Sequence, residues 1–473
     1  MPNNESLVAS SINLVNGKKY STVLVPSSVV GGVLYKFDGV YITDSNNDID
    51  YNTEIYYGNG SQWVEITPSA TKIVGIEADF ANNTFTRIED SANWSAGSDF
   101  DRVKCYQRRR CNVTDDGHVT AYYGDANYTE SGFTQTSITV QDGTTFPAGT
   151  EVQVMVEQPK VWYKVEAITT DGTRMDKGRY YVADGPVTGF KVHPAFIRNE
   201  VEYDNLYISA YEATLYDASE SSYTGGSAIT PDYLTDKLSS VKGTNLYPLT
   251  NLTRENYRDL AAARGNNWTQ LTIQAHSLEQ LLMSIEYCSF NLQTVLSAGN
   301  TNSSGANIIG SVTTLNSSGT GLAGASVSAT NSFTWRYAEN VYGDVNKYQD
   351  GLNTNGGNAY IADHGFNSNY YNTAPYVATG LYIRDNQTYG YLFISRFHYK
   401  EEFDWLLVAC STGGDGSTPI NDKSYVLGST REPRVGGCWN DGSGAGAFCF
   451  YADGLVGAVN ANIGTRLCYM SQN

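Results

Sequence analysis

The chain alternates short apolar runs with turn-forming residues over most of its length. Residues 21–42 and 53–66 read as strands and hairpins, because their Val, Ile and Tyr residues are separated by Gly, Asn and Asp. Residues 152–168 are a long run of alternating positions and predict one strand, and residues 205–217 predict another. The pattern is typical of a protein rich in short β-strands.

Two stretches carry helical signals instead. Residues 253–265 begin with Thr253 as a candidate N-cap and end on a glycine. Residues 277–287 place four apolar side chains on one helical face, and Ser277 with Gln280 matches a capping box at its start. Helices beside many short strands predict an α+β fold for the C-terminal part.

At 473 residues, the chain is too long for one ordinary core, so two or three domains are expected. Changes in the residue pattern along the chain predict an N-terminal all-β module over residues 1–72, a second β-rich module over 73–195 and an α+β domain over 196–473. Gly, Ser, Asn and Thr dominate residues 297–331, where scattered Ile, Val and Leu favour an ordered insertion over a flexible linker.

The charge balance argues against several classes of partner. The chain has 49 acidic and 31 basic side chains, and its formal charge of −18 repels nucleic-acid backbones and anionic membrane surfaces. The N-terminus lacks a basic and apolar leader, and no apolar run is long enough to cross a membrane. The seven scattered cysteines predict reduced thiols in a protein made in a cytoplasm, without membrane insertion.

No set of catalytic or metal-ligating residues emerges, so we predict a protein that is not an enzyme and holds no cofactor or metal. The five histidines lie far apart in sequence, and no paired cysteine spacing of a zinc site occurs. Asp363 and His364 are only a weak acid–base signal, and Asp404 with two nearby glutamates reads as a solvated acidic cluster. Residues 319–324 match a dinucleotide motif by letters, but no helical pattern follows them.

Residues 436–466 combine a frame that looks fixed with letters that look interchangeable. Gly-Gly-x-Trp opens the segment, Gly-Ser-x-Ala-Gly and an aromatic residue follow, and Asn-Ile-Gly-x-Arg closes it. The frame residues are Gly436, Gly437, Trp439, Gly442, Ser443, Ala445, Gly446, Phe448, Asn462, Ile463, Gly464 and Arg466. This order resembles the variable region of the target proteins of diversity-generating retroelements, a family that includes phage tropism determinants and other receptor-binding tail proteins.

Further segments agree with this resemblance, which covers the chain from about residue 72 to its end. Residues 253–268, 281–293 and 335–351 follow in the expected order. The last of them resembles a block shared with the formylglycine-generating-enzyme branch of the C-type lectin fold. The resemblance therefore implies N-terminal all-β modules followed by an α+β C-type lectin-like domain.

In that family, a template repeat is copied into the gene with mutations at template adenines. An Asn codon can thereby become Asp, Tyr, His, Ser, Gly, Cys, Ala, Val or Leu, but not Lys, Glu, Gln, Met or Trp. Every slot between the frame residues holds a residue from the reachable set, including Cys449, which stands where Tyr is usual. The variable positions are Cys438, Asn440, Asp441, Gly444, Cys449, Tyr451, Asp453, Gly454, Gly457, Ala458 and Asn460.

The resemblance implies that the frame is buried, with Trp439 and Phe448 in the core and Arg466 paired inside, while the variable side chains share one solvent face. Binding could then change without unfolding. Tyr451 is the expected contact anchor, because tyrosine gives contact area at a low entropy cost. Hydrogen bonds to a ligand are expected from Asn440, Asp441, Asp453 and Asn460. Cys468 is expected in the core.

The implied function is a receptor-binding protein on a phage virion. Its N-terminal modules would contact other virion proteins, and its last domain would bind a protein or glycan on the host cell surface. A homotrimer is expected by the same resemblance, since linking three sites raises avidity by ~10²–10⁴.

Three alternatives stay open beside this reading. They are a structural fibre or capsid decoration protein, a host-encoded adhesin, and a formylglycine-generating-type oxidase, for which Cys438 and Cys449 are too far apart in sequence. Calcium binding is a further alternative. Trp439-Asn440-Asp441 resembles a calcium-binding triplet of C-type lectins, but Arg434 stands where a liganding Asn is needed.

Overall fold

The computed structural model describes five short strands within residues 34–66 and residues 71–312, 315, 329–368, 371, 373–383 and 390–472. The chain divides into two compact units, Met1–Lys72 and Ile73–Asn473. In the first unit, β1, β4 and β5 form one antiparallel sheet, and β2 pairs with β3. These strands are β1 (Leu34–Phe37), β2 (Tyr41–Thr43), β3 (Ile49–Tyr51), β4 (Glu54–Gly58) and β5 (Trp63–Ile66). The part of the predicted hairpin region over residues 21–33 lies outside the described residues.

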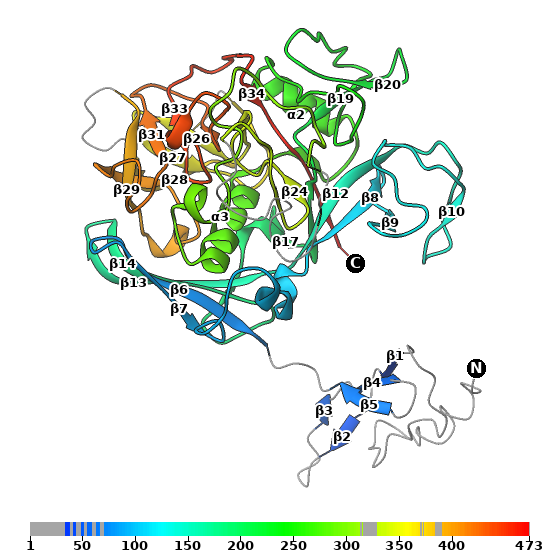
Figure 1. The fold of residues 1–473 in the computed structure, drawn as a ribbon, viewed down its shortest axis with the longest axis horizontal. Coiled ribbons are helices and arrows are strands. Elements are labelled where there is room, and N and C mark those ends of the chain that lie inside the picture. The colour runs from blue at the N-terminus through cyan, green and yellow to red at the C-terminus, as the bar shows by residue number, and fades with distance from the viewer. Residues whose placement is uncertain are drawn as a thin grey trace. The chain divides into compact units, whose positions relative to one another are not determined.

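The second unit is mostly β-sheet with few helices, and three sheets form most of it (Figure 1). An antiparallel five-stranded sheet has the order β15-β13-β14-β6-β7. Its strands are β6 (Ile73–Asp79), β7 (Thr84–Glu89), β13 (Trp162–Asp171), β14 (Arg174–Ala183) and β15 (Lys191–Val192). An antiparallel six-stranded sheet has the order β22-β35-β18-β12-β8-β9. Its strands are β8 (Arg109–Thr114), β9 (Val119–Tyr122), β12 (Val152–Pro159), β18 (Asn205–Ser209), β22 (Trp268–Gln270) and β35 (Leu467–Ser471).

The third large sheet is mixed and has the order β30-β29-β31-β33-β32-β25-β34. Its strands are β25 (Asn346–Tyr348), β29 (Leu392–Phe397), β30 (Ala409–Thr412), β31 (Lys423–Val426), β32 (Arg434–Val435), β33 (Phe450–Ala452) and β34 (Ile463–Gly464). Within the second unit, β29, β31 and β33 lie on the side opposite to β8, β9 and β10 (Figure 1).

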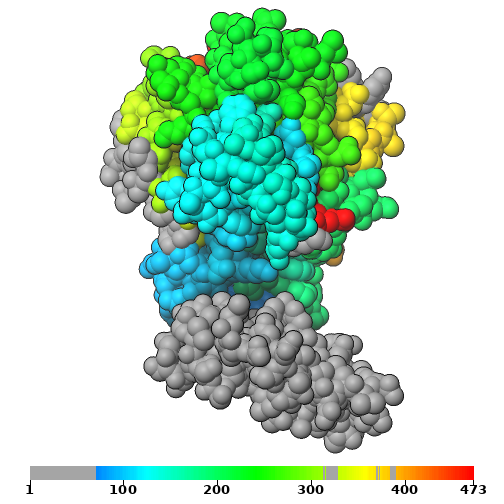
Figure 2. Space-filling model, turned by 90° about the vertical axis from the view of Figure 1, so that its right-hand side faces the viewer, coloured from blue at the N-terminus to red at the C-terminus, as the bar shows by residue number. Residues whose placement is uncertain are grey.

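Shorter strands complete the unit. They are β10 (Ile138–Thr139), β11 (Thr145–Phe146), β16 (Ile197–Arg198), β17 (Val201–Glu202), β19 (Thr214–Asp217), β20 (Ser222–Thr224), β21 (Lys237–Ser239), β23 (Thr334–Trp335), β24 (Ala338–Glu339), β26 (Leu352–Asn355), β27 (Asn358–Ile361) and β28 (Val377–Tyr382). The space-filling view shows the segment with β8 to β11 (cyan) in the middle of one face, below the segment with β19 and β20 (green) (Figure 2).

Two predicted long strands are each divided in the structure. The run over residues 152–168 forms β12 and β13, which belong to different sheets and meet at a break after Pro159. Proline has no N–H for a sheet ladder, so it marks the point where the chain leaves one sheet for the other. Residues 205–217 likewise form β18 and β19 in two sheets.

Among the described residues, the helices are α2 (Arg254–Ala262), α3 (Ile273–Tyr287) and α4 (Leu292–Val295), with short 3₁₀ turns at Ser98–Arg102, Lys104–Tyr106, Pro194–Phe196, Glu401–Phe403 and Gly442–Gly444. The predicted N-cap of α2 is confirmed, because the Thr253 hydroxyl accepts a hydrogen bond from the Asn256 N–H at 3.1 Å. The helix ends at Ala262, earlier than predicted.

The predicted start of α3 is wrong. The helix begins four residues earlier, and its N-cap is Thr272, whose hydroxyl accepts from the Ala275 N–H. Ser277 lies inside the helix and donates to the Trp405 carbonyl at 2.9 Å, and Gln280 donates to the Ala447 carbonyl at 2.7 Å. Both side chains therefore bind distant backbone rather than the helix end, which a local motif cannot reveal.

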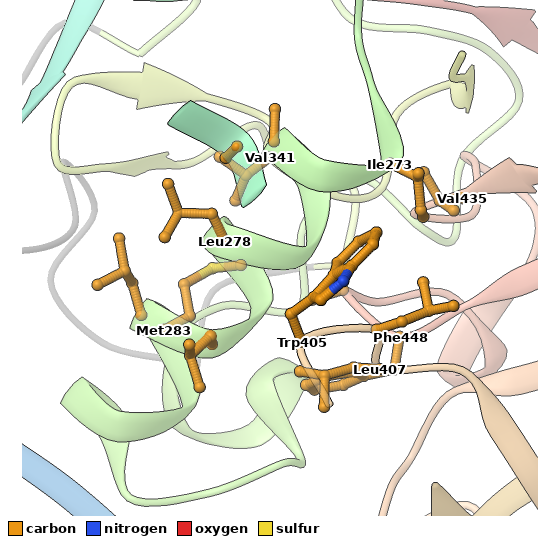
Figure 3. Packing of buried hydrophobic residues seen from close by; sticks show 14 of the residues in the cluster. Ile273, Leu278, Met283, Val341, Trp405, Leu407, Val435 and Phe448 are labelled. Carbon is orange, nitrogen blue, oxygen red and sulfur yellow. The ribbon is translucent and has the colours of Figure 1, made fainter. Parts of the chain in front are cut away.

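Helix α3 is the centre of the core. All of its residues except the last are buried. It passes between Val341 on one side and Trp405 and Phe448 on the other (Figure 3). The same apolar cluster contains Val74 and Val165, so the expected boundary near residue 195 does not separate two cores. Phe448 and Phe450 of the C-terminal segment belong to this cluster, whereas Ile463 and Leu467 belong to a second, smaller one.

Candidate functional site

The frame of residues 436–466 is fixed by backbone geometry that requires glycine. Gly437 has a φ of 68°, and a Cβ there would lie 2.6 Å from Ala445. Gly446 has a φ of 138°, and a Cβ there would lie 2.2 Å from the Asp422 carboxylate. A side chain at either position would strain the backbone and collide with a neighbouring residue. Both turns of the frame therefore require glycine.

Two further frame residues, Phe448 and Arg466, hold the segment against the core. The Phe448 ring lies 5.5 Å from Phe290 and 5.0 Å from Phe397, and the Phe448 N–H donates to Asp422 at 2.6 Å. Arg466 is buried and donates to two carbonyls, those of Ser209 at 2.8 Å and Glu339. The expected pairing of Arg466 is thus with backbone oxygens. Buried with them are Gly436, Gly437, Ile463, Gly464 and, in β35, Cys468.

Trp439 does not fill the core, contrary to prediction, because its side chain is only partly buried. The backbone of Trp439, and not its side chain, connects this position to neighbouring segments. The Trp439 N–H donates to the Asp344 carbonyl at 2.9 Å, and its carbonyl accepts from the Ser303 N–H at 2.7 Å. The position is held by main-chain bonds, while the indole reaches toward the surface.

The positions predicted to be variable divide into three groups by exposure. Asn440, Gly457 and Asn460 are exposed. Asp441, Asp453, Gly454 and Ala458 are partly buried. Cys438, Gly444, Cys449 and Tyr451 are buried, so the prediction that every variable side chain faces solvent is wrong for these four. Their strand and turn positions point inward, which the codon pattern does not reveal.

In the loop of residues 438–441, side chains form hydrogen bonds within the loop and with Asn462. Asp441 accepts from the Cys438 N–H at 2.8 Å, and Asn462 donates to the Cys438 sulfur at 3.2 Å. Burial and the Asp441 carboxylate raise the pKa of Cys438 to about 12. Burial also raises the pKa of Cys449. Thiols held protonated are poor nucleophiles, which weighs against a thiol-dependent oxidase at this place.

Tyr451 lies in β33, at the centre of the mixed sheet, between Tyr425 of β31 and Arg434 of β32. Only 2% of its surface is exposed. Its ring meets the edge of Tyr391 at 4.8 Å and 81°, and the Arg434 guanidinium lies 5.3 Å from its centre. Tyr451 therefore supports the surface from below instead of projecting from it.

Asp453 is held by three residues from outside the variable segment. One carboxylate oxygen lies 2.6 Å from an Arg434 nitrogen, and the other accepts from the Tyr391 hydroxyl at 2.6 Å. The Asp453 carbonyl accepts from Arg431 at 2.6 Å. The ion pair on one oxygen and the hydrogen bond on the other fix this carboxylate in one orientation.

The following loop has an anchored backbone and exposed side chains. The Gly457 N–H donates to the buried Glu432 carboxylate at 2.9 Å, and the Asn460 carbonyl accepts from the Asn251 N–H at 3.1 Å. Between these anchors, Val459 is 48% exposed. Main-chain anchors of this kind let side chains change while the loop keeps its course.

Other candidates from the sequence behave differently. Asp404 is buried, not solvated as predicted, and accepts from the Tyr163 hydroxyl at 2.6 Å. The Asp363–His364 contact of 2.6 Å is half-exposed and recruits no third catalytic group among the described residues. The motif at residues 319–324 lies outside the described residues. In the described part of the chain, no group of three or more His, Cys, Asp or Glu is arranged to hold a metal, and no helix could span a membrane.

Sequence reasoning missed Tyr391 and Arg434 as neighbours of the variable residues. Arg434 drew notice only as a departure from a calcium motif, and Tyr391 gave no local signal. Both reach the site through strand pairing of the mixed sheet, so their place depends on long-range contacts.

Comparison with known proteins gives only distant likenesses. No protein-family model and no curated protein matches the chain. Among solved structures, the chain is similar to the Major Tropism Determinant U1 variant at 12% identity and a TM-score of 0.28, over 92% of this chain and 96% of the other. The I1 variant gives 10% identity and a TM-score of 0.27, over 94% and 96%.

Proposed function

We propose that this chain is a receptor-binding protein of a phage virion, and that residues 436–466 form its diversified recognition surface for a host cell-surface molecule. The observation that carries the proposal is the contrast within this segment. Its frame is locked by obligatory glycines, the Phe448 ring and the Arg466 hydrogen bonds, whereas Asn440 and Asn460 stand in solvent on anchored loops.

Energetics support this division of labour. Substitutions at exposed loop positions usually change stability by within about ±0.5 kcal/mol, whereas loss of a buried aromatic ring costs ~3–5 kcal/mol. A protein that must vary its binding without losing its fold needs variable residues of the first kind. The exposed and half-buried slots around Asp453 and Asn460 meet that need, while buried slots such as Tyr451 tolerate fewer replacements.

The remaining parts of the proposal follow from the sequence resemblance. The second unit is proposed to be C-type lectin-like, and the first unit to attach to other virion proteins. The assembly is proposed to be a homotrimer, which would multiply weak contacts. A fibre or decoration protein is the competing function, and it predicts no specific binding to cells.

The test is binding of the labelled full-length protein to intact bacteria from a panel of strains. The variant Asn440→Lys with Asn460→Lys places a long charged side chain at two exposed slots that diversification cannot fill with Lys. A matched control, Gln141→Lys with Thr170→Lys, adds the same charge at two exposed positions outside the segment. We expect at least ~10-fold weaker binding for the first variant and wild-type binding for the control. Equal binding of all three proteins would refute the proposed surface.

A further inference from the structure

The most exposed aromatic side chain at the proposed surface comes from outside the variable segment. Tyr391 is 46% exposed and precedes β29, far from residues 436–466 in sequence. Its ring edge rests on Tyr451, and its hydroxyl donates to Asp453. A residue outside the proposed diversified segment thus contacts two residues inside it.

These contacts fix the direction in which Tyr391 points. The edge-to-face contact with Tyr451 at 4.8 Å holds the ring, and the 2.6 Å hydrogen bond to Asp453 holds the hydroxyl. Asp453 is itself braced by Arg434 at 2.6 Å. Tyr425 contacts the same ring at 4.8 Å. A tyrosine held in this way has lost its freedom before a ligand arrives, so binding costs it little entropy.

We propose that Tyr391 is a specificity-determining contact residue of the recognition surface, and that the variable residues at positions 451 and 453 act by orienting it. This inference rests on the proposed receptor-binding function. Under it, Tyr451 and Asp453 contribute to recognition although one is buried and the other is half-buried. Diversification at positions 451 and 453 would change the direction in which the constant Tyr391 side chain points. A single substitution there would therefore alter the contact between Tyr391 and the receptor.

The occupants reachable at position 451 make the mechanism specific. From a tyrosine codon, one adenine change gives Phe, Ser or Cys. Phenylalanine would keep the ring that supports Tyr391, whereas serine or cysteine would remove it and leave Tyr391 without its platform. At position 453, a residue without a side-chain oxygen, such as Ala or Gly, would release both the Tyr391 hydroxyl and Arg434.

The test combines single substitutions with a double-mutant cycle, using the full-length protein and bacteria that bind the wild type. Tyr391→Ala should weaken binding ~30-fold or more, as expected for a tyrosine hot spot. Tyr391→Phe and Asp453→Ala should each weaken it ~3–10-fold, because both remove the hydrogen bond that the Tyr391 hydroxyl donates to Asp453. The double variant should be no weaker than the weaker single variant, since the shared interaction can be lost only once.

Stability provides the control for this cycle. Tyr391→Phe should shift the thermal midpoint by less than about 2 °C, so that lost binding cannot be ascribed to unfolding. Wild-type binding within twofold after Tyr391→Ala would overturn the inference, and so would full additivity of Tyr391→Phe and Asp453→Ala. Absence of wild-type binding to every strain would instead refute the proposed function itself.

Discussion

Mild acid should destabilise the second unit through two buried histidines. His276 lies in the middle of α3, and its Nε2–H donates to the Ala447 carbonyl of the variable segment at 3.0 Å. His193 is equally buried, and its Nδ1 accepts from the Ala195 N–H at 3.2 Å. Burial lowers the pKa of each imidazole from 6.5 to about 3.

The sign and size of the effect follow from proton linkage. Between pH 6.5 and pH 3, the unfolded chain binds protons at these histidines and the folded chain does not, so stability falls as the pH falls. At pH 5, the difference from the unfolded pKa is about 1.5 units, which corresponds to ~2 kcal/mol for each histidine. The value depends little on the folded pKa, provided that this stays well below 5.

The assay is urea unfolding followed by tryptophan fluorescence at pH 7.5 and pH 5.0. The variant His276→Gln keeps an amide donor but has no proton to gain. We expect the pH-dependent loss of unfolding free energy to be ~2 kcal/mol smaller in this variant than in the wild type. Other groups, such as the buried Asp422, whose pKa burial raises, affect both proteins alike and cancel in the difference. If the two proteins showed the same pH dependence, the claim that burial keeps His276 uncharged at pH 5 would be refuted.

Further substitutions test the frame and the thiols. Phe448→Ala should lower the free energy of unfolding by ~3–5 kcal/mol, whereas Asn460→Ala should change it by no more than about 0.5 kcal/mol, both measured by urea unfolding. Arg466→Met should cost ~2–5 kcal/mol, because two buried carbonyls lose their donors, and a loss below ~1 kcal/mol would contradict that role. Cys438 and Cys449 should react with dithionitrobenzoate at least ~10-fold more slowly in the folded protein than in urea, and rapid labelling of either, seen by mass spectrometry, would speak against sealed thiols.

The local parts of this structure were readable from the sequence. The N-cap of α2 at Thr253 was predictable, because a capping hydroxyl and its partner lie three residues apart. The turns at Gly437 and Gly446 were equally predictable in kind, since frame glycines mark backbone that no other residue can adopt. Burial of Phe448 followed from its place in the same frame.

Exposure within the variable segment was decided by tertiary structure alone. Tyr451 looked like a surface anchor by residue type, yet β33 is paired on both sides and its ring is covered by Tyr391 from another part of the chain. Trp439 looked like core, yet its side chain is only partly buried.

The sequence by itself determined which positions need glycine, which stretches are helical or extended, and which residues form a frame. The tertiary structure decided where α3 begins, which sheet each half of residues 152–168 joins, and whether Tyr451 or Tyr391 meets solvent. The physical reason is the difference in sequence range between the two kinds of interaction. Backbone preference and periodicity act over a few residues, whereas burial depends on partners such as Tyr391 and Tyr451, which become neighbours only when distant strands pair.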